Sequence, residues 1–184
     1  QIDVMDGRFV SNVTWANPAV IHGWRTPTQF EVHLMVHEPT RAVIAWGKLK
    51  HVQRIIVHHE AARHLDHLLR LVRLTGKQVG LAVNPSTPFH WILPHVRLVD
   101  MVLVMSNDPG FSGKPFKKST LRRVAALRRR FPKLHIGVDI GVNLTTAPLP
   151  RKAGATHIAA ASSIFGAPDP VAAYQALDVA FRKA

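Results

Sequence analysis

The feature that most constrains the fold is a regular alternation between short apolar runs and amphipathic segments. Seven runs rich in β-branched residues are predicted strands, at residues 1–4, 30–34, 54–57, 78–83, 101–106, 135–139 and 156–160. Between two of them, the segment AARHLDHLLRLVRL places Leu65, Leu68, Leu69 and Val72 at the i, i+3, i+4, i+7 spacing of an amphipathic helix. Strands that alternate with helices predict an α/β protein with a parallel sheet.

The arrangement of these units favours a barrel over an open sheet. Seven βα units fit a TIM (β/α)8 barrel that lacks one unit better than a doubly wound sheet, because no G-x-G-x-x-G or G-x-x-x-x-G-K-[ST] motif follows any predicted strand. No linker, low-complexity tract or charge block divides the chain. A single barrel domain over residues 1–184 is therefore expected.

Composition narrows the class of protein further. The chain has 184 residues and is 47% hydrophobic, which suffices for one sizeable core. It has no cysteine, which excludes disulfides and thiolate zinc sites, and no apolar run reaches the roughly 18 residues of a membrane span. These features predict a cytoplasmic protein without a membrane partner.

The formal net charge of +13 has two interpretations. In the segment KKSTLRRVAALRRRF, Leu121, Val124 and Leu127 share one helical face, and the arginines would then form an ordinary solvated face. The alternative is a surface that binds nucleic acid. The absence of aromatic residues among these charges argues against nucleic acid, because bases bind by stacking on aromatic rings.

Polar residues recur where the predicted strands end, which is where TIM barrels carry their chemistry. They are Asp3, Asp6, His33, His58, His59, Glu60, Asn84, Ser106, Asn107, Asp108, Asp139, Ser162 and Ser163. Asp3, His33 and Asp139 would bring two carboxylates and an imidazole to one rim, a donor set that suits a divalent metal. The alternative is that these three residues cap helices or pair with arginines.

Several segments together resemble a known family. They are IDVMDGRFVSN, EVHLMVHEP, VHHEA, GLAVNPSTP, VLVMSNDPGFSGKPF, GVDIGVNLTTAP and AGATHIAAASSIFG. In order and spacing they are similar to ribulose-phosphate 3-epimerases, over essentially the whole chain. The most specific of these matches are D-V-M-D-G, H-L-M and M-S-x-x-P-G-F.

The resemblance implies a metal-dependent barrel enzyme of carbohydrate metabolism whose first βα unit is missing from this sequence. It implies the interconversion of D-ribulose 5-phosphate and D-xylulose 5-phosphate through an enediolate. Asp3 and Asp139 would be acid and base as well as metal ligands, and His33 a further ligand. Gln1 stands where the family has a metal-binding histidine and would be a weak replacement. The metal would be Zn, Fe, Mn or Co.

The resemblance also implies a set of substrate-binding residues. These are His33, Met35, Gly110, Phe111, Ser112, Gly113, Gly141, Ala161 and Ser162. Backbone N–H groups beside glycines would hold the phosphate. Met5, Met35 and Met105 match the family's apolar lining around the intermediate.

The chain departs from the family at several of these positions. Ile140 and Ala161 replace glycines, and Asp108 and Lys114 also differ, with Lys114 expected to offset the charge of Asp108. These changes leave open a catalytically impaired homologue. An epimerase of another ketose phosphate, such as allulose 6-phosphate, would use the same residues and also stays open, and the positive charge leaves a basic nucleic-acid-binding barrel as a further alternative. Homo-oligomerisation is also left open.

The sequence makes two further predictions, one about a turn and one about a group of histidines. Asp6 is predicted to order a turn with Gly7. His58, His59, His64 and His67 could form a second metal patch, although exposure on a helix is the simpler interpretation for His64 and His67.

Overall fold

The computed structural model describes residues 1–184, and its seven strands follow one another in chain order. The strands are β1 (Ile2–Met5), β2 (Phe30–Met35), β3 (Val52–His58), β4 (Gln78–Val83), β5 (Met101–Met105), β6 (His135–Asp139) and β7 (His157–Ile158). The pairs β1–β2, β2–β3, β3–β4 and β6–β7 are parallel. The predicted parallel α/β fold is confirmed, and each predicted strand is present.

The strand β7 is shorter than predicted, with two residues in place of five. Backbone pairing with β6 continues on both sides of it. The Thr156 N–H donates to the Ile136 carbonyl at 2.8 Å and the Ala159 N–H donates to the Val138 carbonyl at 2.9 Å. The predicted segment is therefore paired along most of its length, although its regular ladder covers only the centre.

Helices and short 3-10 turns connect the strands. The helices are α1 (Pro18–His22), α2 (Thr40–Gly47), α3 (Leu65–Leu74), α4 (Thr120–Arg130), α5 (Pro148–Lys152), α6 (Ser162–Phe165) and α7 (Pro170–Arg182). The 3-10 turns are η1 (His59–Ala61), η2 (Phe89–Trp91) and η3 (Leu93–Leu98). None of the helices has the length and apolar character that a membrane crossing requires.

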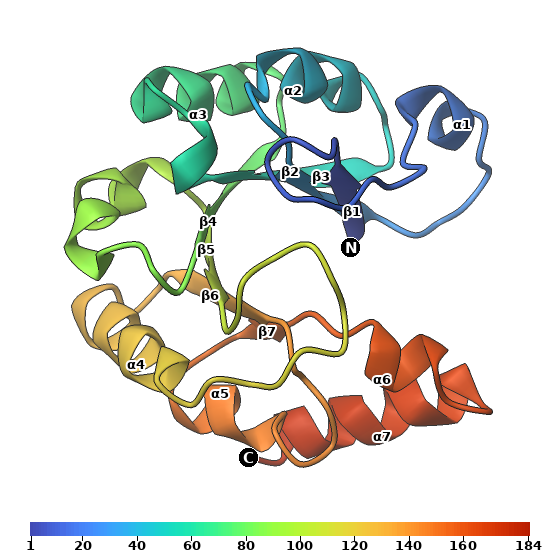
Figure 1. The fold of residues 1–184 in the computed structure, drawn as a ribbon, viewed down its shortest axis with the longest axis vertical. Helices are drawn as coiled ribbons and strands as arrows, with labels where there is room; N and C mark the ends of the chain where they lie inside the picture. Colours follow the sequence, from blue (N-terminus) through green and yellow to red (C-terminus); the bar gives the residue numbers. More distant parts are fainter. The chain divides into compact units, whose positions relative to one another are not determined.

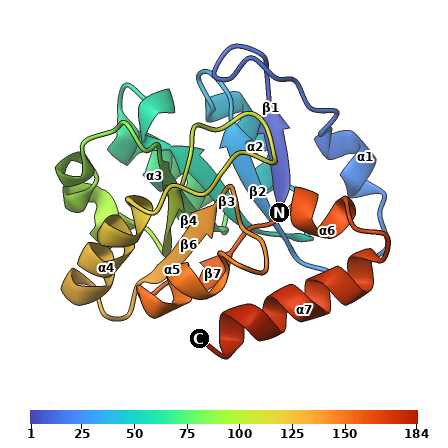
Figure 2. The same cartoon turned by 60° about the horizontal axis from the view of Figure 1, so that its bottom comes forward.

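The first of two compact units comprises residues 1–83 and 87–101. Its strands β1, β2 and β3 run alongside one another in the same direction (Figure 2), and α2 and α3 lie side by side next to them (Figure 1). The four predicted core positions of α3, from Leu65 to Val72, are all buried. Each such side chain contributes about 1.5–3 kcal/mol when it leaves water, which fixes the face of the helix that meets the sheet.

The second unit comprises residues 84–86 and 102–184. The long helix α7, which follows α6 near the C-terminus (Figure 2), buries Leu177 and Phe181 against Val142 and Ala147. Helix α4 buries Val124 and Leu127, as its sequence pattern predicted, and exposes Arg122, Arg129 and Arg130.

Two further arginines of α4 have structural partners. Arg123 donates to the carbonyl oxygens of Asn84 at 2.9 Å and Pro85 at 2.5 Å. Arg128 donates to the carbonyl oxygens of Gly154 and Leu134, both at 2.9 Å. These two arginines therefore bind backbone carbonyl groups of neighbouring segments, so this part of α4 is not a purely solvated face.

Candidate functional site

The strand register of the first unit brings Asp3 and His33 together. They are direct neighbours in the parallel pair β1–β2. The Asp3 Oδ1 atom lies 3.3 Å from His33 Nδ1; the imidazole is fully buried, whereas the carboxylate is 39% exposed. The Asp3 carboxylate and the Nδ1 atom of His33 therefore lie close together, and solvent reaches them from the side of Asp3. These two donors fit a divalent cation with nitrogen and oxygen ligands.

The side chain of Gln1 lies beside both Asp3 and His33. Its amide nitrogen is 2.7 Å from Asp3 Oδ1 and 3.5 Å from His33 Nδ1. Burial alone would raise the pKa of Asp3. The hydrogen bond and charge of His33, together with the hydrogen bond of the Gln1 amide, lower this pKa by more than burial raises it, so the net shift is downward. Asp3 is therefore ionised at neutral pH. Coordination of a metal by Gln1 would require the amide to turn its oxygen toward Asp3.

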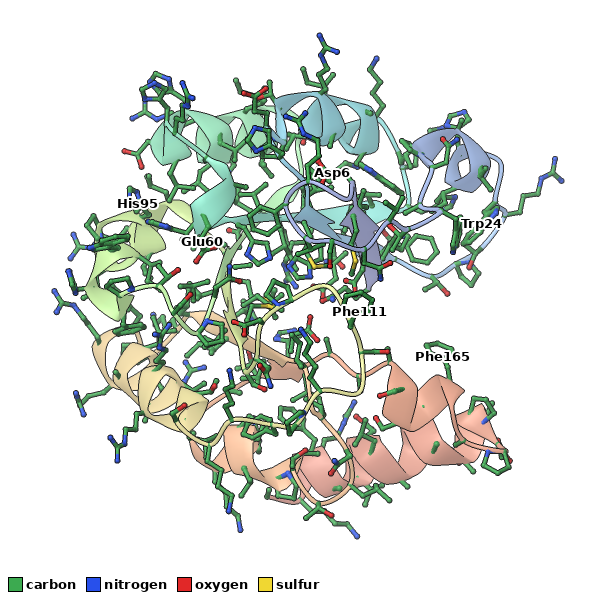
Figure 3. All side chains as sticks on the ribbon, in the orientation of Figure 1. Asp6, Trp24, Glu60, His95, Phe111 and Phe165 are labelled. Atoms are coloured by element: carbon green, nitrogen blue, oxygen red, sulfur yellow. The ribbon has the colours of Figure 1, made fainter.

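Behind His33, a chain of polar side chains runs through the buried His58 to Glu60, which is exposed to solvent. His33 Nε2 lies 2.8 Å from His58 Nε2, and the two rings stack with centroids 4.9 Å apart. His58 Nδ1 lies 3.2 Å from Glu60 Oε2, and the hydroxyl of Thr87 donates to the other oxygen of Glu60. Figure 3 labels Glu60, in the turn that directly follows β3.

The strand register explains why His58 reaches His33. His33 is paired with Ile56, and His58 lies two residues further along β3. Side chains two residues apart on a strand point to the same face, so His58 lies diagonally across from His33. Full burial lowers the pKa of His58 to about 4, although Glu60 acts in the opposite direction. His58 is therefore a neutral imidazole at pH 7.

In the second unit, Asp139 ends β6 and is held by backbone groups. The Ile140 N–H donates to Asp139 Oδ1 at 2.6 Å, and the Ser106 N–H donates to the Asp139 carbonyl at 2.9 Å. The Ser106 hydroxyl donates to the Ile140 carbonyl at 2.7 Å. Ile140 has a φ of 74°, which a β-branched residue rarely adopts, so this turn stores backbone strain.

Gly141 continues the strained turn with a φ of 72°. A Cβ atom at this position would lie 2.4 Å from the Phe116 nitrogen and 2.9 Å from the Lys114 carbonyl oxygen. The loop after β5 therefore packs directly on the backbone of Gly141. Only glycine allows this approach.

The loop after β5 carries most of the predicted phosphate-binding residues. Gly110 and Gly113 have φ values of 111° and 80°, and Phe111 is 52% exposed and projects from the loop (Figure 3). The Asn107 side-chain amide donates to the Pro115 carbonyl at 2.9 Å and closes the base of the loop. Ser112 is exposed.

The charge of Asp108 in this loop is offset differently from the prediction. The sequence suggests that Lys114 offsets part of this charge, but Lys114 donates to the backbone carbonyl of Asp108 at 2.8 Å. The cation nearer the carboxylate is Lys117, whose Nζ lies 3.8 Å from Asp108 Oδ2.

The remaining predicted residues lie at other strand ends. Met5 and Met35 are buried neighbours at the ends of β1 and β2, and Met105 is buried at the end of β5. Ala161 and Ser162 are both exposed, directly before and at the start of α6.

Two expectations outside the site have clear outcomes. Asp6 orders its turn as predicted, because its carboxylate accepts the N–H groups of Arg8, Phe9 and His37. The second histidine patch contains no group of three donors that could hold a metal ion.

Sequence reasoning did not find the polar chain behind His33. It grouped His58 with neighbouring histidines and assigned no role to Glu60 or Thr87. The signal was the spacing His58-x-Glu60 at the end of a strand that neighbours the H-L-M strand. Its use requires the strand register, because a shift of one residue turns His58 to the opposite face.

Comparison with known proteins agrees with the motifs. Residues 1–165 match the model of the ribulose-phosphate 3 epimerase family. The chain is 38% identical over 176 residues to the ribulose-phosphate 3-epimerase of Bacillus subtilis, covering 91% of this chain and 80% of that protein. It is 37% identical over 175 residues to a ribulose-phosphate 3-epimerase of Oryza sativa subsp. japonica named as a cytoplasmic isoform, covering 92% and 76%.

Solved structures agree with the predicted fold. The crystal structure of KGPDC from Streptococcus mutans matches with a TM-score of 0.72 at 9% identity, over 90% of this chain and 78% of that one. At this identity the likeness concerns the fold alone, and it identifies the TIM-barrel class of α/β proteins. The seven strands are consistent with a barrel that lacks one βα unit.

Proposed function

Because the chain belongs to the ribulose-phosphate 3-epimerase family, a family of isomerases, we propose that it interconverts D-ribulose 5-phosphate and D-xylulose 5-phosphate. The observation that carries the proposal is the ionised Asp3 beside the buried His33, each within a specific motif of the family. Both residues lie on strands of a parallel sheet, each two residues before the C-terminal residue of its strand, and the C-terminal strand ends are where TIM barrels carry their active sites.

The reaction requires a base in contact with C3 of the sugar. A C–H bond next to a ketone is a very weak acid, so its proton leaves only when a carboxylate is positioned against it. Asp3 is ionised at neutral pH and partly exposed, which allows it to accept this proton. The product of this step is an enediolate.

Inversion at C3 requires a second acid/base group on the opposite face of the enediolate. We assign this role to Asp139, which ends β6 in the family's G-V-D segment. The Ile140 N–H, at 2.6 Å, orients the carboxylate of Asp139. One aspartate must be protonated while the other is ionised, and the two exchange roles when the reaction reverses.

The donor set fits a divalent metal, which we assign to Asp3, His33 and Asp139, with Gln1 as a weaker fourth ligand. When bound, Zn, Fe, Mn or Co would act as a Lewis acid that stabilises negative charge on the substrate oxygens. His33 is suited to hold it because its ring is immobilised by stacking on His58.

The phosphate would be held by backbone N–H groups in three segments, two of which contain glycine. We assign this site to Gly110, Phe111, Ser112, Gly113, Gly141, Ala161 and Ser162. The buried methionines Met5, Met35 and Met105 would give the intermediate an apolar lining that excludes water.

The test is direct conversion of ribulose 5-phosphate to xylulose 5-phosphate, followed by carbon NMR. The protein would be stripped with a chelator and then supplied with Zn²⁺, Mn²⁺, Fe²⁺ or Co²⁺ in separate samples. Conversion that depends on one of these ions supports the proposal. A folded, metal-supplied protein that converts neither this substrate nor allulose 6-phosphate would contradict it, and conversion of allulose 6-phosphate alone would correct the substrate.

A catalytically impaired homologue is the second candidate, and a specific observation favours it. Ile140 places a branched, strained residue where the family has glycine beside the phosphate site. The same experiment separates the two, because impairment predicts conversion that Ile140→Gly increases. A nucleic-acid-binding role has less support, since Arg123 and Arg128 are engaged by backbone carbonyls. We also propose the cytoplasmic location named for the rice relative.

A further inference from the structure

We propose that the hydroxyl groups of Ser106 and Thr146 orient the turn after β6 so that the backbone N–H groups of Gly141 and Val142 face the phosphate of the sugar. The inference rests on the proposed function, which assigns phosphate binding to Gly141. Ser106, Thr146 and Val142 lie outside the residues assigned there to the metal, the substrate or proton transfer. Ser106 and Thr146 are positioning residues, because they act through the backbone of the turn.

Two successive carbonyl oxygens of this turn accept hydrogen bonds from side-chain hydroxyls. The Ser106 hydroxyl donates to the Ile140 carbonyl at 2.7 Å, and the Thr146 hydroxyl donates to the Gly141 carbonyl at 2.8 Å. Two other oxygens near the Thr146 hydroxyl, the carbonyl and side-chain oxygens of Asn143, are further away, at 3.4 and 3.3 Å. Both carbonyl groups are therefore held by the protein itself.

The position of each carbonyl group fixes the direction of an N–H group. The peptide of the Ile140 carbonyl contains the N–H of Gly141, and the peptide of the Gly141 carbonyl contains the N–H of Val142. The chain has no cis peptide bond, and in a planar trans peptide the N–H points opposite to the C=O. Each of the two N–H groups therefore points away from the hydroxyl that holds its peptide.

These two N–H groups fit an anion. Neither of them donates a hydrogen bond to another group of the protein. Val142 is only 5% exposed, and buried backbone N–H groups are almost always paired. Successive N–H groups in a turn form concavities that bind anions, and Gly141, with a φ of 72°, lies in such a turn. A phosphate group would satisfy both donors.

The next peptide of the turn is held in the same way, but its N–H has a partner. The Ser163 hydroxyl donates to the Val142 carbonyl at 2.8 Å. The N–H of this peptide belongs to Asn143 and donates to the Thr146 hydroxyl oxygen at 2.9 Å. This third peptide therefore offers no N–H to a ligand, and Asn143 provides an internal reference for the first test.

The first test is a titration of the metal-free wild-type protein with inorganic phosphate, followed by nitrogen–proton NMR of the backbone amides. We expect the amide protons of Gly141 and Val142 to move downfield, because each gains a short, charge-assisted hydrogen bond. The amide proton of Asn143 should move far less, since its acceptor does not change. Signals of Gly141 and Val142 that stay in place throughout the titration would overturn the proposal without any variant.

The second test compares variants by their affinity for inorganic phosphate. Thr146→Val removes the hydroxyl with little change of shape, whereas Thr146→Ser keeps it. The dissociation constant should rise about tenfold in Thr146→Val and in Ser106→Ala, and it should return to within about twofold of the wild-type value in Thr146→Ser. Thr156→Val is the matched control, because the Thr156 hydroxyl lies 3.2 Å from the Ile136 carbonyl, near the opposite end of β6. This control should keep the wild-type affinity.

The kinetics distinguish positioning from a merely structural role. With ribulose 5-phosphate, Thr146→Val should raise KM about tenfold and leave kcat nearly unchanged, because the turn acts on phosphate binding. A merely structural role would lower the amount of folded protein and leave KM at the wild-type value.

Folded Thr146→Val and Ser106→Ala proteins with wild-type phosphate affinity would overturn the proposal. If neither variant folds, the titration of the wild-type protein decides. Failure of the proposed function has a different signature: the amides of Gly141 and Val142 respond to phosphate as expected, but the protein does not convert ribulose 5-phosphate.

Discussion

Asp3 and Asp139 both lie on strands of a parallel sheet, but the two units hold them by different means. Side chains surround Asp3: the Gln1 amide and the imidazole of His33, with His58 behind. Asp139 is oriented by a backbone N–H on a turn whose next residue has a φ of 74°. A site held by side chains can be adjusted by single substitutions, whereas a strained turn depends on every loop that packs on it.

The surroundings of Asp3 and of Asp139 also differ in how they affect stability. In the chain from His33 to Thr87, His33, His58 and Thr87 are buried, Glu60 reaches solvent, and a hydrogen bond joins each contact, so the chain stabilises one geometry. The turn at Ile140 costs roughly 1–2 kcal/mol of backbone strain. It is retained by the hydroxyl of Ser106 and by close packing of the Phe116 backbone on Gly141.

The largest expected effect is on catalysis, where the two aspartates should be equivalent despite their different supports. Asp3→Asn and Asp139→Asn should each slow epimerisation by about 10²–10⁴-fold, because each removes one of two acid/base groups. Initial rates with saturating metal would measure this, and His59→Gln should keep the wild-type rate. Wild-type activity in either aspartate variant would contradict the two-base mechanism.

The second largest effect, a loss of stability, is expected in the second unit, where backbone groups hold Asp139. Gly141→Ala should destabilise the protein by roughly 2–4 kcal/mol, since it adds both left-handed strain and a clash with Phe116. Gly76→Ala is the matched control: Gly76 has a φ of 77°, but a Cβ there meets nothing within 4 Å. Denaturant unfolding of both variants would isolate the clash, and equal losses would show that the packing on Gly141 is unimportant.

A smaller effect is expected at Asp6, which is held by three backbone N–H groups. Burial raises the pKa of Asp6, but these hydrogen bonds lower it below 3.8. Its stabilisation is therefore complete above pH 3.8 and is lost as the pH falls through the folded-state pKa.

Asp6→Asn should accordingly cost about 1–2 kcal/mol at pH 7. The difference from the wild type should shrink when the pH is lowered below 3.8, the ordinary value for this group. Thermal unfolding at a series of pH values would measure this. A difference that is constant down to pH 2 would mean that the carboxylate charge plays no part.

The smallest effect should be a gain. Ile140→Gly relieves the strain of a φ of 74°, but glycine loses more backbone entropy on folding, so a net stabilisation of at most about 1 kcal/mol is expected. Melting temperatures would measure it. A loss of stability would show that packing of the Ile140 side chain outweighs the strain of its backbone.

The sequence predicted features that depend on side-chain pattern. Seven β-branched runs gave seven strands, and the spacing of leucines in α3 predicted its buried face. The rule that polar residues gather at strand ends placed Asp3 beside His33. These predictions succeed because apolar periodicity and strand polarity are local properties of the chain.

Other features depend on contacts between distant segments and could not be predicted. The pairing of His33 with His58 depends on the register of β2 and β3, and the left-handed backbone at Ile140 depends on hydrogen bonds from Ser106. The structural bonds of Arg123 and Arg128 were hidden in a helix that appeared uniformly basic. The sequence pattern predicts which face of the helix an arginine occupies, but it does not predict which carbonyl groups that arginine can reach.

The most direct test of the two-base mechanism is proton exchange at C3 in heavy water, measured by NMR for each sugar phosphate separately. We expect the wild-type protein to exchange the C3 proton of both ribulose 5-phosphate and xylulose 5-phosphate. Asp3→Asn should lose exchange with one of the two, and Asp139→Asn should lose exchange with the other, because each aspartate serves one face. Loss of exchange with the same sugar in both variants would contradict the assignment of Asp3 and Asp139 to opposite faces.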